Sequence, residues 1–442
     1  KSISSLGISL NGSSYRGIGN ISIGNNSIGI FAKSMITGNL ISQGTGIENM
    51  NVGNNGLGIY GEGSGDVIAN MSNITIGSSN ATGVYTKGMN STVKGNMSIG
   101  ANTSIGIVSE GSGNVSYTGS MAIENKIASG SVGIYKLIGA GTISTSTGSW
   151  SVGNNGYGIY IQQAKTENIN EKEIITITSN SATVNNNADM ILGTSAVGIF
   201  SNGNNIINNA GNIAVGATDI KNNNHTDSDQ HLNSIGIYAA NGTKINNTGN
   251  ITVNHDHSIG VYAQGEKTNF INTGVINGGI GVLVRNGATA VNAAGGNIIL
   301  GNNIASCKTA TVGMAAYGGA RIENAGTITV NEGVGMLLGV GATFSNTGNI
   351  FVKNGIGIEG PGTLTNSGNI TILPGGTGSA TALTGLATAQ VGSVIIKPDG
   401  TILINDKYTS IGGTLSTAGN IVVNGAYVDV TTGTPLFNAN SV

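Results

Sequence analysis

The chain has 442 residues, a formal net charge of −2, and charged residues make up only 9% of it. With three arginines in all (Arg16, Arg285 and Arg321), it has no basic patch to neutralise phosphates, which excludes the usual nucleic-acid-binding surfaces. The single cysteine, Cys307, excludes an internal disulfide framework, and no apolar run approaches the roughly 20 residues of a membrane-spanning helix.

The composition favours many tight turns between short strands. Glycine is the residue at 75 positions, proline at only 4, and 38% of the residues are hydrophobic. Abundant Gly and Asn supply turn conformations, and the spaced Ile and Val residues supply half-buried strands. Disorder is excluded because disordered chains lack these apolar residues and carry a high net charge.

A short motif of Gly, then Ile or Val, then an aromatic residue recurs along the chain. It occurs at residues 29–31, 58–60, 83–85, 133–135, 158–160, 198–200, 236–238 and 260–262. The spacing between the glycines varies, from 21 residues (Gly260 to Gly281) to 40 residues (Gly158 to Gly198). Such a repeat, which is too short to bury its own apolar face, predicts a solenoid.

A second motif lies between these copies and reads Asn-x-Gly-x-Ile-x-Val/Ile. Clean copies occupy residues 247–253 and 346–352. Its first Asn recurs at a fixed offset, which predicts a ladder of stacked amides in which each side chain bonds the next. The alternative is a set of independent turn residues that tolerate left-handed backbone angles. The ladder would contain Asn209, Asn247, Asn272, Asn324, Asn346 and Asn366.

Together the motifs predict an all-β fold, a right-handed parallel β-helix of about 16 coils with about 22 residues in a regular coil. The variable spacing fits a right-handed coil because its turns accept insertions. We expect one solenoid domain over residues 1–442, with loop insertions near 162–193 and 217–234. Because the chain begins at Lys1 and not at Met, we expect a segment of a longer protein.

Units such as residues 234–239, followed by residues 245–253, resemble the passenger repeats of type V autotransporters. The richness in Asn, Ile and Gly is similar to that of the large fusobacterial outer-membrane autotransporter adhesins. The resemblance covers residues 15 to 425 and implies a monomeric adhesin at the cell surface that binds host-cell glycans, host receptors or other bacteria. It also implies a membrane anchor through a C-terminal barrel, which we expect to lie outside this segment.

The aromatic residues of the first motif are candidate ligand-binding residues. If both aliphatic residues of Ser-Ile-Gly-Ile-Tyr point inward, Gly and Tyr share the outer face, and one ring per coil would line up along the solenoid. Such a stripe could stack against sugars or anchor a protein partner. Alternatively, each ring lies over the Gly of its neighbour and only stiffens the stack. The stripe would contain Phe31, Tyr60, Tyr85, Tyr135, Tyr160, Phe200, Tyr238 and Tyr262.

All four histidines lie in one short stretch, in the second insertion and in the equivalent turn one coil later. Stacking would bring these turns to one corner, where imidazole and carboxylate groups could bind a divalent metal such as zinc or nickel. The alternative is a solvated polar loop pair, and no cofactor is otherwise expected. The candidate ligands are His225, Asp227, Asp229, His231, His255 and His257.

The two insertions are further candidates for recognition, because loops of solenoids often carry the binding face. No nucleophile elbow, zincin or phosphate-loop motif occurs, so we expect no enzymatic activity. The sequence leaves three functions open. They are an extracellular adhesin, a spacer that displays a binding domain elsewhere, and a β-helical polysaccharide-processing enzyme or tailspike-like protein.

Overall fold

A computed structural model describes residues 5–11, 15–17, 19–33, 40–43, 48–124, 130–169, 172–177, 180–216, 234–254, 258–301, 311–373, 380–384, 388–396, 414–417 and 421–423. These residues form strands, turns and bends, and among them no helix is long and apolar enough to cross a membrane. The structure divides into two compact units, Lys1–Lys244 (unit 1) and Ile245–Val442 (unit 2), which are described separately.

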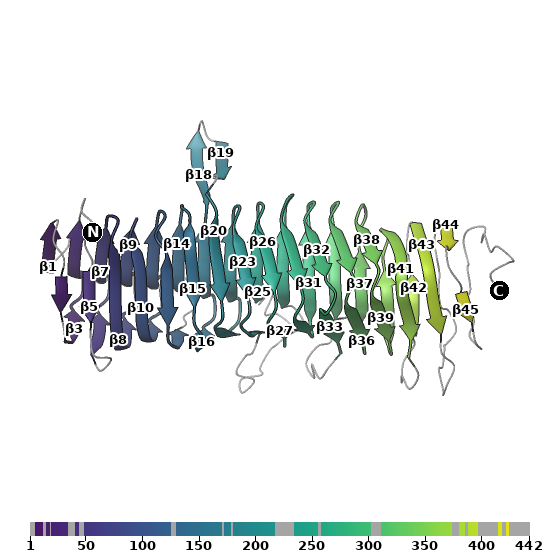
Figure 1. Cartoon of the computed structure of the whole chain (residues 1–442), viewed down its shortest axis with the longest axis horizontal. Coiled ribbons are helices and arrows are strands. Elements are labelled where there is room, and N and C mark those ends of the chain that lie inside the picture. Colours follow the sequence, from purple (N-terminus) through teal and green to yellow (C-terminus); the bar gives the residue numbers. More distant parts are fainter. Residues whose placement is uncertain are drawn as a thin grey trace. The chain divides into compact units, whose positions relative to one another are not determined.

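Both units are built from the same coil of three short strands, which are named rows A, B and C in chain order (Figure 1). Within each unit, a strand pairs in parallel with the strand of the same row in the next coil. Non-consecutive strands are therefore neighbours, and each coil completes the backbone hydrogen bonds of the coil before it. The predicted parallel β-helix is confirmed.

In unit 1, row A carries the Gly-Ile-aromatic motif. Its strands are β1 (Ser5–Asn11), β4 (Ser27–Lys33), β7 (Leu57–Glu62), β9 (Thr82–Lys87), β11 (Ile105–Glu110), β14 (Val132–Leu137), β17 (Tyr157–Gln162), β22 (Val197–Asn202) and β25 (Ile235–Ala240). Row B contains β2 (Tyr15–Gly17), β5 (Leu40–Gln43), β12 (Val115–Thr118), β15 (Gly141–Thr145), β20 (Ala182–Asn186) and β23 (Ile206–Asn209). Row C contains β3 (Ile21–Ile23), β6 (Asn49–Val52), β13 (Met121–Ile123), β16 (Ser149–Val152), β21 (Asp189–Leu192) and β24 (Ile213–Val215). Two long strands, β8 (Asp66–Ile76) and β10 (Asn90–Ile99), run through both rows.

Unit 2 repeats the arrangement. Row A contains β28 (Ile259–Gln264), β31 (Ile280–Arg285), β34 (Val312–Tyr317), β37 (Val334–Leu338), β40 (Gly355–Glu359) and β42 (Ala380–Thr384). Row B contains β26 (Lys244–Asn247), β29 (Asn269–Asn272), β32 (Thr289–Asn292), β35 (Arg321–Asn324), β38 (Thr343–Asn346) and β44 (Thr414–Thr417). Row C contains β27 (Asn250–Val253), β30 (Val275–Asn277), β33 (Asn297–Leu300), β36 (Thr327–Val330), β39 (Asn349–Val352) and β45 (Ile421–Val423). Here β41 (Thr363–Ile372) and β43 (Thr388–Ile396) run through rows B and C.

The first predicted insertion, 162–193, contains two kinds of structure. An antiparallel hairpin of β18 (Ala164–Ile169) and β19 (Lys172–Ile177) pairs only with itself. The rest of the interval contains β20 and β21, which are ordinary members of rows B and C. The second predicted insertion, 217–234, lies outside the described residues except for Ser234.

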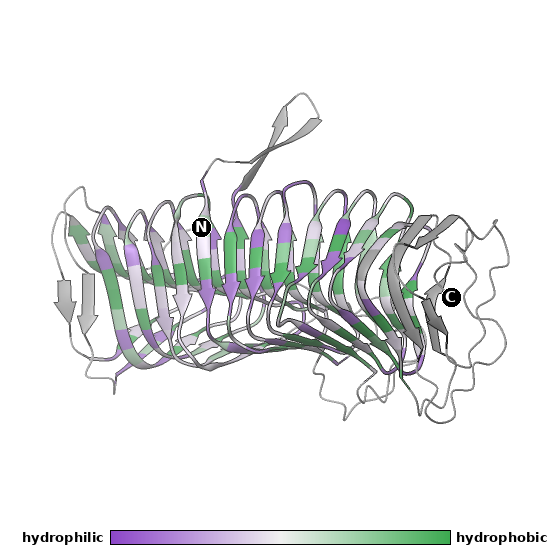
Figure 2. Ribbon diagram, turned by 45° about the vertical axis from the view of Figure 1, so that its right-hand side comes forward, coloured by the Kyte–Doolittle hydropathy of each residue, from purple (hydrophilic) through white to green (hydrophobic). Residues whose placement is uncertain are grey.

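The core follows from the alternation of apolar and polar residues along each strand. In row C, Met50 and Val52 are buried, whereas Asn51 between them is exposed. Met50 pairs in register with Ile74, and Ile74 with Met97, so that like side chains stack from coil to coil. Figure 2 shows the same change between hydrophobic and hydrophilic residues along the strands. Each such side chain contributes about 1.5–3 kcal/mol on burial, and no single coil could gain this alone.

The glycine of the row A motif faces the core and not the outer surface, contrary to the sequence prediction. A Cβ on Gly58 would lie 2.3 Å from the carbonyl oxygen of Gly83 and 3.1 Å from Met50 Sδ. Gly106 is similar, since a Cβ there would lie 2.5 Å from the Gly133 oxygen. The residue before the glycine is correspondingly half-exposed, as at Leu57. Glycine recurs here because neighbouring coils approach too closely for any side chain.

The predicted amide ladder is present and buried in unit 2. Each Nδ2 donates to the Oδ1 of the next coil, with distances of 2.9, 2.9, 2.8 and 2.7 Å in order, and also to the carbonyl of its own turn, as Asn247 does to Gly249 at 3.0 Å. Buried amides are tolerated because these bonds satisfy them. The four bonds join Asn247, Asn272, Asn292, Asn324 and Asn346. The side chain of Asn366 lies outside the described residues.

Unit 1 has the ladder only at its C-terminal end, where Asn186 Nδ2 donates to Asn209 Oδ1 at 2.8 Å. Residues that lie in register at one position of successive coils are here called a column. The preceding members of the column that contains Asn186 are Thr145, Tyr117, Val93 and Ala69. Thr145 Oγ1 still bonds Asn186 Oδ1, at 2.8 Å. The Tyr117 hydroxyl donates to the turn carbonyl of Ser120 at 2.8 Å, as the amides do to their own turns.

Unit 1 also buries a lysine. Lys136, on β14, has no exposed surface, and its Nζ donates to the carbonyl oxygens of Gly111 and Gly113, both at 2.7 Å, and to Ser109 Oγ at 3.1 Å. Burial lowers the pKa of Lys136 from 10.5 to about 8. Three acceptors on the preceding coil nonetheless match the three donors of an ammonium group.

Candidate functional site

The aromatic residues predicted as a stripe lie on row A, one per coil and in register. On β4, β7 and β9, Phe31 pairs with Tyr60 and Tyr60 with Tyr85. Further along, Tyr135, Tyr160, Phe200 and Tyr238 pair in the same way on β14, β17, β22 and β25. All seven are half-buried and form what is here named the aromatic row of unit 1.

The rings stack on one another and do not lie over glycine. Phe31 and Tyr60 are 4.9 Å apart between ring centroids with an interplanar angle of 10°, and Tyr60 and Tyr85 are 5.3 Å apart at 25°. The Phe200 ring lies 4.4 Å from Tyr160 and 4.8 Å from Tyr238, both nearly parallel. These separations follow from the strand spacing of about 4.8 Å. Ring faces are thus covered by neighbouring rings, which leaves edges and hydroxyls for contact with a ligand.

The row is interrupted at β11, where Val108 lies in register between Tyr85 and Tyr135. Val108 is only 4% exposed. Beyond it, Tyr135 meets Tyr160 edge-on at 76°. Tyr157 joins this cluster from the position before the motif glycine, 5.1 Å from Tyr160 at 85°. The sequence prediction missed Tyr157 because it placed that position in the core.

The N-terminal end of the row carries charge. The Tyr60 hydroxyl donates to Glu62 at 3.0 Å, and the Tyr85 hydroxyl donates to Glu110. Lys87 Nζ lies between the two carboxylates, 3.8 Å from Glu62 and 3.9 Å from Glu110. Burial, then the bond to Glu62, raises the pKa of Tyr60 to about 12, so its hydroxyl remains a donor at neutral pH. The ion pairs are partly exposed and contribute less than about 1 kcal/mol each.

Unit 2 does not continue the row in its described strands. Tyr262 on β28 is half-buried, and its hydroxyl donates to Gln264 at 3.1 Å. The residues in register after it are Leu283, Ala315, Leu337 and Glu359. Seven of the eight predicted stripe residues therefore lie in register in unit 1, and Tyr262 precedes aliphatic residues in row A of unit 2.

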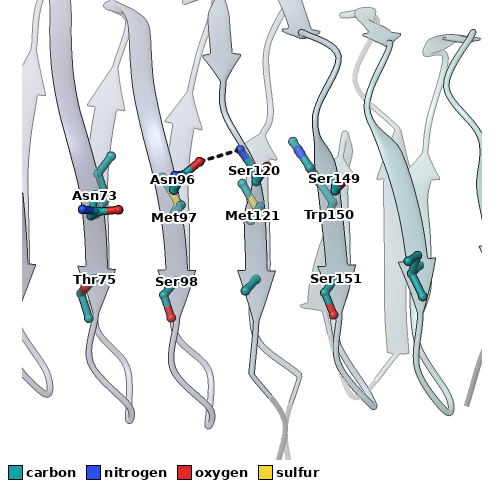
Figure 3. A pocket seen from close by; sticks show the side chains of 13 residues that line it. Asn73, Thr75, Asn96, Met97, Ser98, Ser120, Met121, Ser149, Trp150 and Ser151 are labelled. Atoms are coloured by element: carbon teal, nitrogen blue, oxygen red, sulfur yellow. Dashed lines mark hydrogen bonds between the residues drawn. The ribbon is translucent and has the colours of Figure 1, made fainter. Parts of the chain in front are cut away.

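A second surface feature of unit 1 is a shallow groove of about 460 Å³ over row C (Figure 3). Its floor is formed by small side chains in register, Thr75, Ser98, Ala122 and Ser151. Asn73, Asn96, Ser120 and Ser149 form a parallel row two residues earlier, and the 51%-exposed Ile191 lies at the end of the floor. The groove offers amides and hydroxyls, and no charged residue lines it.

The predicted metal ligands His225, Asp227, Asp229, His231, His255 and His257 lie outside the described residues. Among the residues that the structure does describe, no three His, Cys, Asp or Glu side chains are grouped closely enough to hold a metal ion.

No protein-family profile, curated protein or solved structure matches this chain.

Proposed function

We propose that this chain is a non-catalytic segment of an extracellular bacterial surface adhesin, displayed in the manner of a type V autotransporter, which binds host-cell glycans, host receptors or other bacteria. The observation that carries the proposal is the aromatic row of unit 1. Seven half-exposed rings in one line are more aromatic surface than scattered residues would provide.

The geometry of the row suits recognition without catalysis. Tyrosines provide apolar area and a hydroxyl at a low cost in conformational entropy, and stacking has already fixed their rotamers. Tyr60 and Tyr85 hold their hydroxyls against Glu62 and Glu110, so this end offers ring edges and carboxylates together. The other end, around Tyr157 and Phe200, offers ring edges and tyrosine hydroxyls, of which that of Tyr160 donates to Gln162 at 3.4 Å.

A spacer that displays a binding domain elsewhere is the second candidate. It is favoured by the stacking of the rings themselves, since parallel rings 4.4–5.3 Å apart cover each other's faces. In this alternative the row only stiffens the coil stack.

Binding of the purified chain to host cells, a glycan array and partner bacteria tests the proposal. The informative variant carries Tyr160→Thr, Phe200→Thr and Tyr238→Thr, because threonine retains strand propensity while the rings are removed. Leu337→Thr is the matched control, since Leu337 is half-exposed on row A of unit 2. Circular dichroism confirms that each variant keeps its β-structure.

We expect the wild-type chain and the control to bind, and the triple variant to lose binding by at least about tenfold, as removal of central aromatic anchors does elsewhere. Absence of binding by the wild-type chain on every surface would leave the spacer as the better explanation. Release of reducing sugars from a polysaccharide panel would instead favour an enzyme.

A further inference from the structure

The aromatic row of unit 1 lacks one ring. Strand β11 places Val108 in the column where β9 carries Tyr85 and β14 carries Tyr135. The two tyrosines are therefore two coils apart, which is roughly 10 Å at a strand spacing of about 4.8 Å. Neighbouring rings of the row are 4.4–5.3 Å apart between their centroids. The interval between Tyr85 and Tyr135, here named the Val108 gap, thus has the length that one further ring would occupy.

A hydrogen-bond acceptor for the missing ring is present beside the gap. On β7 the Tyr60 hydroxyl donates to Glu62, two residues later on the same strand, at 3.0 Å. Val108 stands in the same relation to Glu110 on β11, because the strands of row A pair in register. The Glu110 side chain is 32% exposed, and a carboxylate has about four lone-pair positions, so it can accept a hydroxyl in addition to that of Tyr85. A phenol ring above Val108 would therefore find Glu110 as Tyr60 finds Glu62.

The two bordering tyrosines lie over the gap. Val108 is only 4% exposed, and in an outward-facing column this burial requires cover from the side chains in register on either side. The Tyr135 ring is turned by 76° against Tyr160, whereas the stacked pairs of the row differ by 25° or less. The Tyr85 hydroxyl reaches across to Glu110 on the strand of the gap. Both tyrosines are half-buried, and side chains of such exposure change rotamer rapidly, so the rings can part without movement of the backbone.

The chemistry of the gap suits a tyrosine side chain better than a sugar ring. Its two walls are aromatic and its floor is the apolar side chain of Val108, whereas its acceptor, Glu110, lies on one side. A tyrosine presents apolar faces and a single hydroxyl, which this arrangement matches. A pyranose carries hydroxyls around its whole edge, and those directed at Val108 would lose water without gaining a partner.

We propose that the Val108 gap receives one exposed tyrosine of a protein partner, stacked between Tyr85 and Tyr135 with its hydroxyl donated to Glu110. The inference rests on the proposed adhesive function and names the partner as a protein that presents tyrosine on its surface. Two ring contacts and a bond to a carboxylate, all shielded from water, are what makes a buried tyrosine dominate the affinity of an interface.

Titration of the purified full chain with p-cresol, the side-chain analogue of tyrosine, tests the inference. Saturation-transfer NMR measures the binding, which we expect to be saturable for the wild-type chain. Val108→Tyr fills the gap with a ring of the chain itself and should weaken p-cresol binding by at least about tenfold. Leu337→Tyr is the matched control and should bind as the wild-type chain does, because it adds the same ring at a half-exposed row A position of unit 2 and leaves the gap open.

A second variant, Glu110→Gln, tests the hydroxyl without adding bulk to the gap. Toluene has the same ring as p-cresol but no hydroxyl, so the wild-type chain should bind p-cresol more tightly, by about fivefold or more. Glu110→Gln replaces a charge-assisted bond by a neutral one and should narrow this preference. A purely structural effect of the substitution would weaken both ligands alike and leave the preference unchanged.

The inference is overturned if Val108→Tyr, with unchanged circular dichroism, binds p-cresol as the wild-type chain does, or if the wild-type chain binds a methyl pyranoside and not p-cresol. Adhesion that survives Val108→Tyr would also count against the tyrosine site and leave the proposed function standing. A wild-type chain that binds p-cresol in the gap but adheres to no cell, glycan or bacterium would contradict the proposed function alone.

Discussion

Units 1 and 2 have the same three-strand coil but fill it differently. In unit 2 the buried turn column of row B contains asparagines from Asn247 to Asn346, whereas the same column in unit 1 begins with Ala69, Val93 and Tyr117. Outside, row A of unit 1 carries stacked rings, and row A of unit 2 carries mainly aliphatic residues after Tyr262. The same backbone thus accepts a polar ladder inside or an aromatic row outside.

The difference shows that backbone pairing sets the architecture and that the columns adjust to it. Every column repeats at about 4.8 Å, a spacing that suits amide-to-amide bonds and parallel rings equally well. The buried row B column is less tolerant, since an amide among apolar residues there has no partner and a valine among amides leaves its neighbours unbonded.

The largest expected effect comes from exchanging residues between the two row B columns. Asn292→Val removes the acceptor of Asn272 and the donor to Asn324, so we expect a loss of about 3 kcal/mol. The reciprocal Val93→Asn buries an amide between Ala69 and Tyr117 and should lose about 2–3 kcal/mol. Urea denaturation followed by circular dichroism measures both. If Asn292→Val unfolds at the wild-type urea concentration, the ladder does not stabilise unit 2.

A smaller effect concerns the buried lysine of unit 1. The folded-state pKa of Lys136, about 8, lies below its ordinary 10.5, so between these values the unfolded chain holds a proton that the folded chain has lost. Stability should therefore rise with pH through this window, by about 2–3 kcal/mol. Lys136→Met should flatten the rise, as measured by urea denaturation at several pH values. An equal slope in the variant would show that the ammonium bonds to Gly111 and Gly113 offset the burial.

The smallest effect is expected from the aromatic row. Phe200→Thr removes two parallel ring contacts, with Tyr160 and Tyr238, which should lower stability by about 1–2 kcal/mol. Leu337→Thr, at a half-exposed row A position of unit 2, should cost less than about 1 kcal/mol. Thermal unfolding of both variants measures the difference. Equal losses would mean that stacking adds nothing beyond apolar burial.

Much of the fold could be predicted from recurring residues. The Gly-Ile-aromatic spacing predicted stacked parallel strands, and the recurring Asn predicted the ladder from Asn247 to Asn346. Two ladder members were missed because their turns differ from the motif, in which a glycine follows two residues after the asparagine. The turn glycine of Asn292 is Gly296, four residues later, and the turn of Asn186 has Ala188 in place of a glycine. The hairpin of β18 and β19 was read as a loop insertion because its Lys and Glu residues obscured the strand pattern.

The recurring residues were enough to predict that parallel strands stack in register, because a one-residue slip would move every apolar side chain of an alternating strand to the other face. The tertiary structure alone decided which way the motif glycine faces and what each ring contacts. Gly58 faces inward because the Gly83 carbonyl leaves no room for a Cβ, a distance between two coils that no local pattern encodes. The same spacing turned a predicted stripe of separate aromatic residues into a stack of rings in mutual contact.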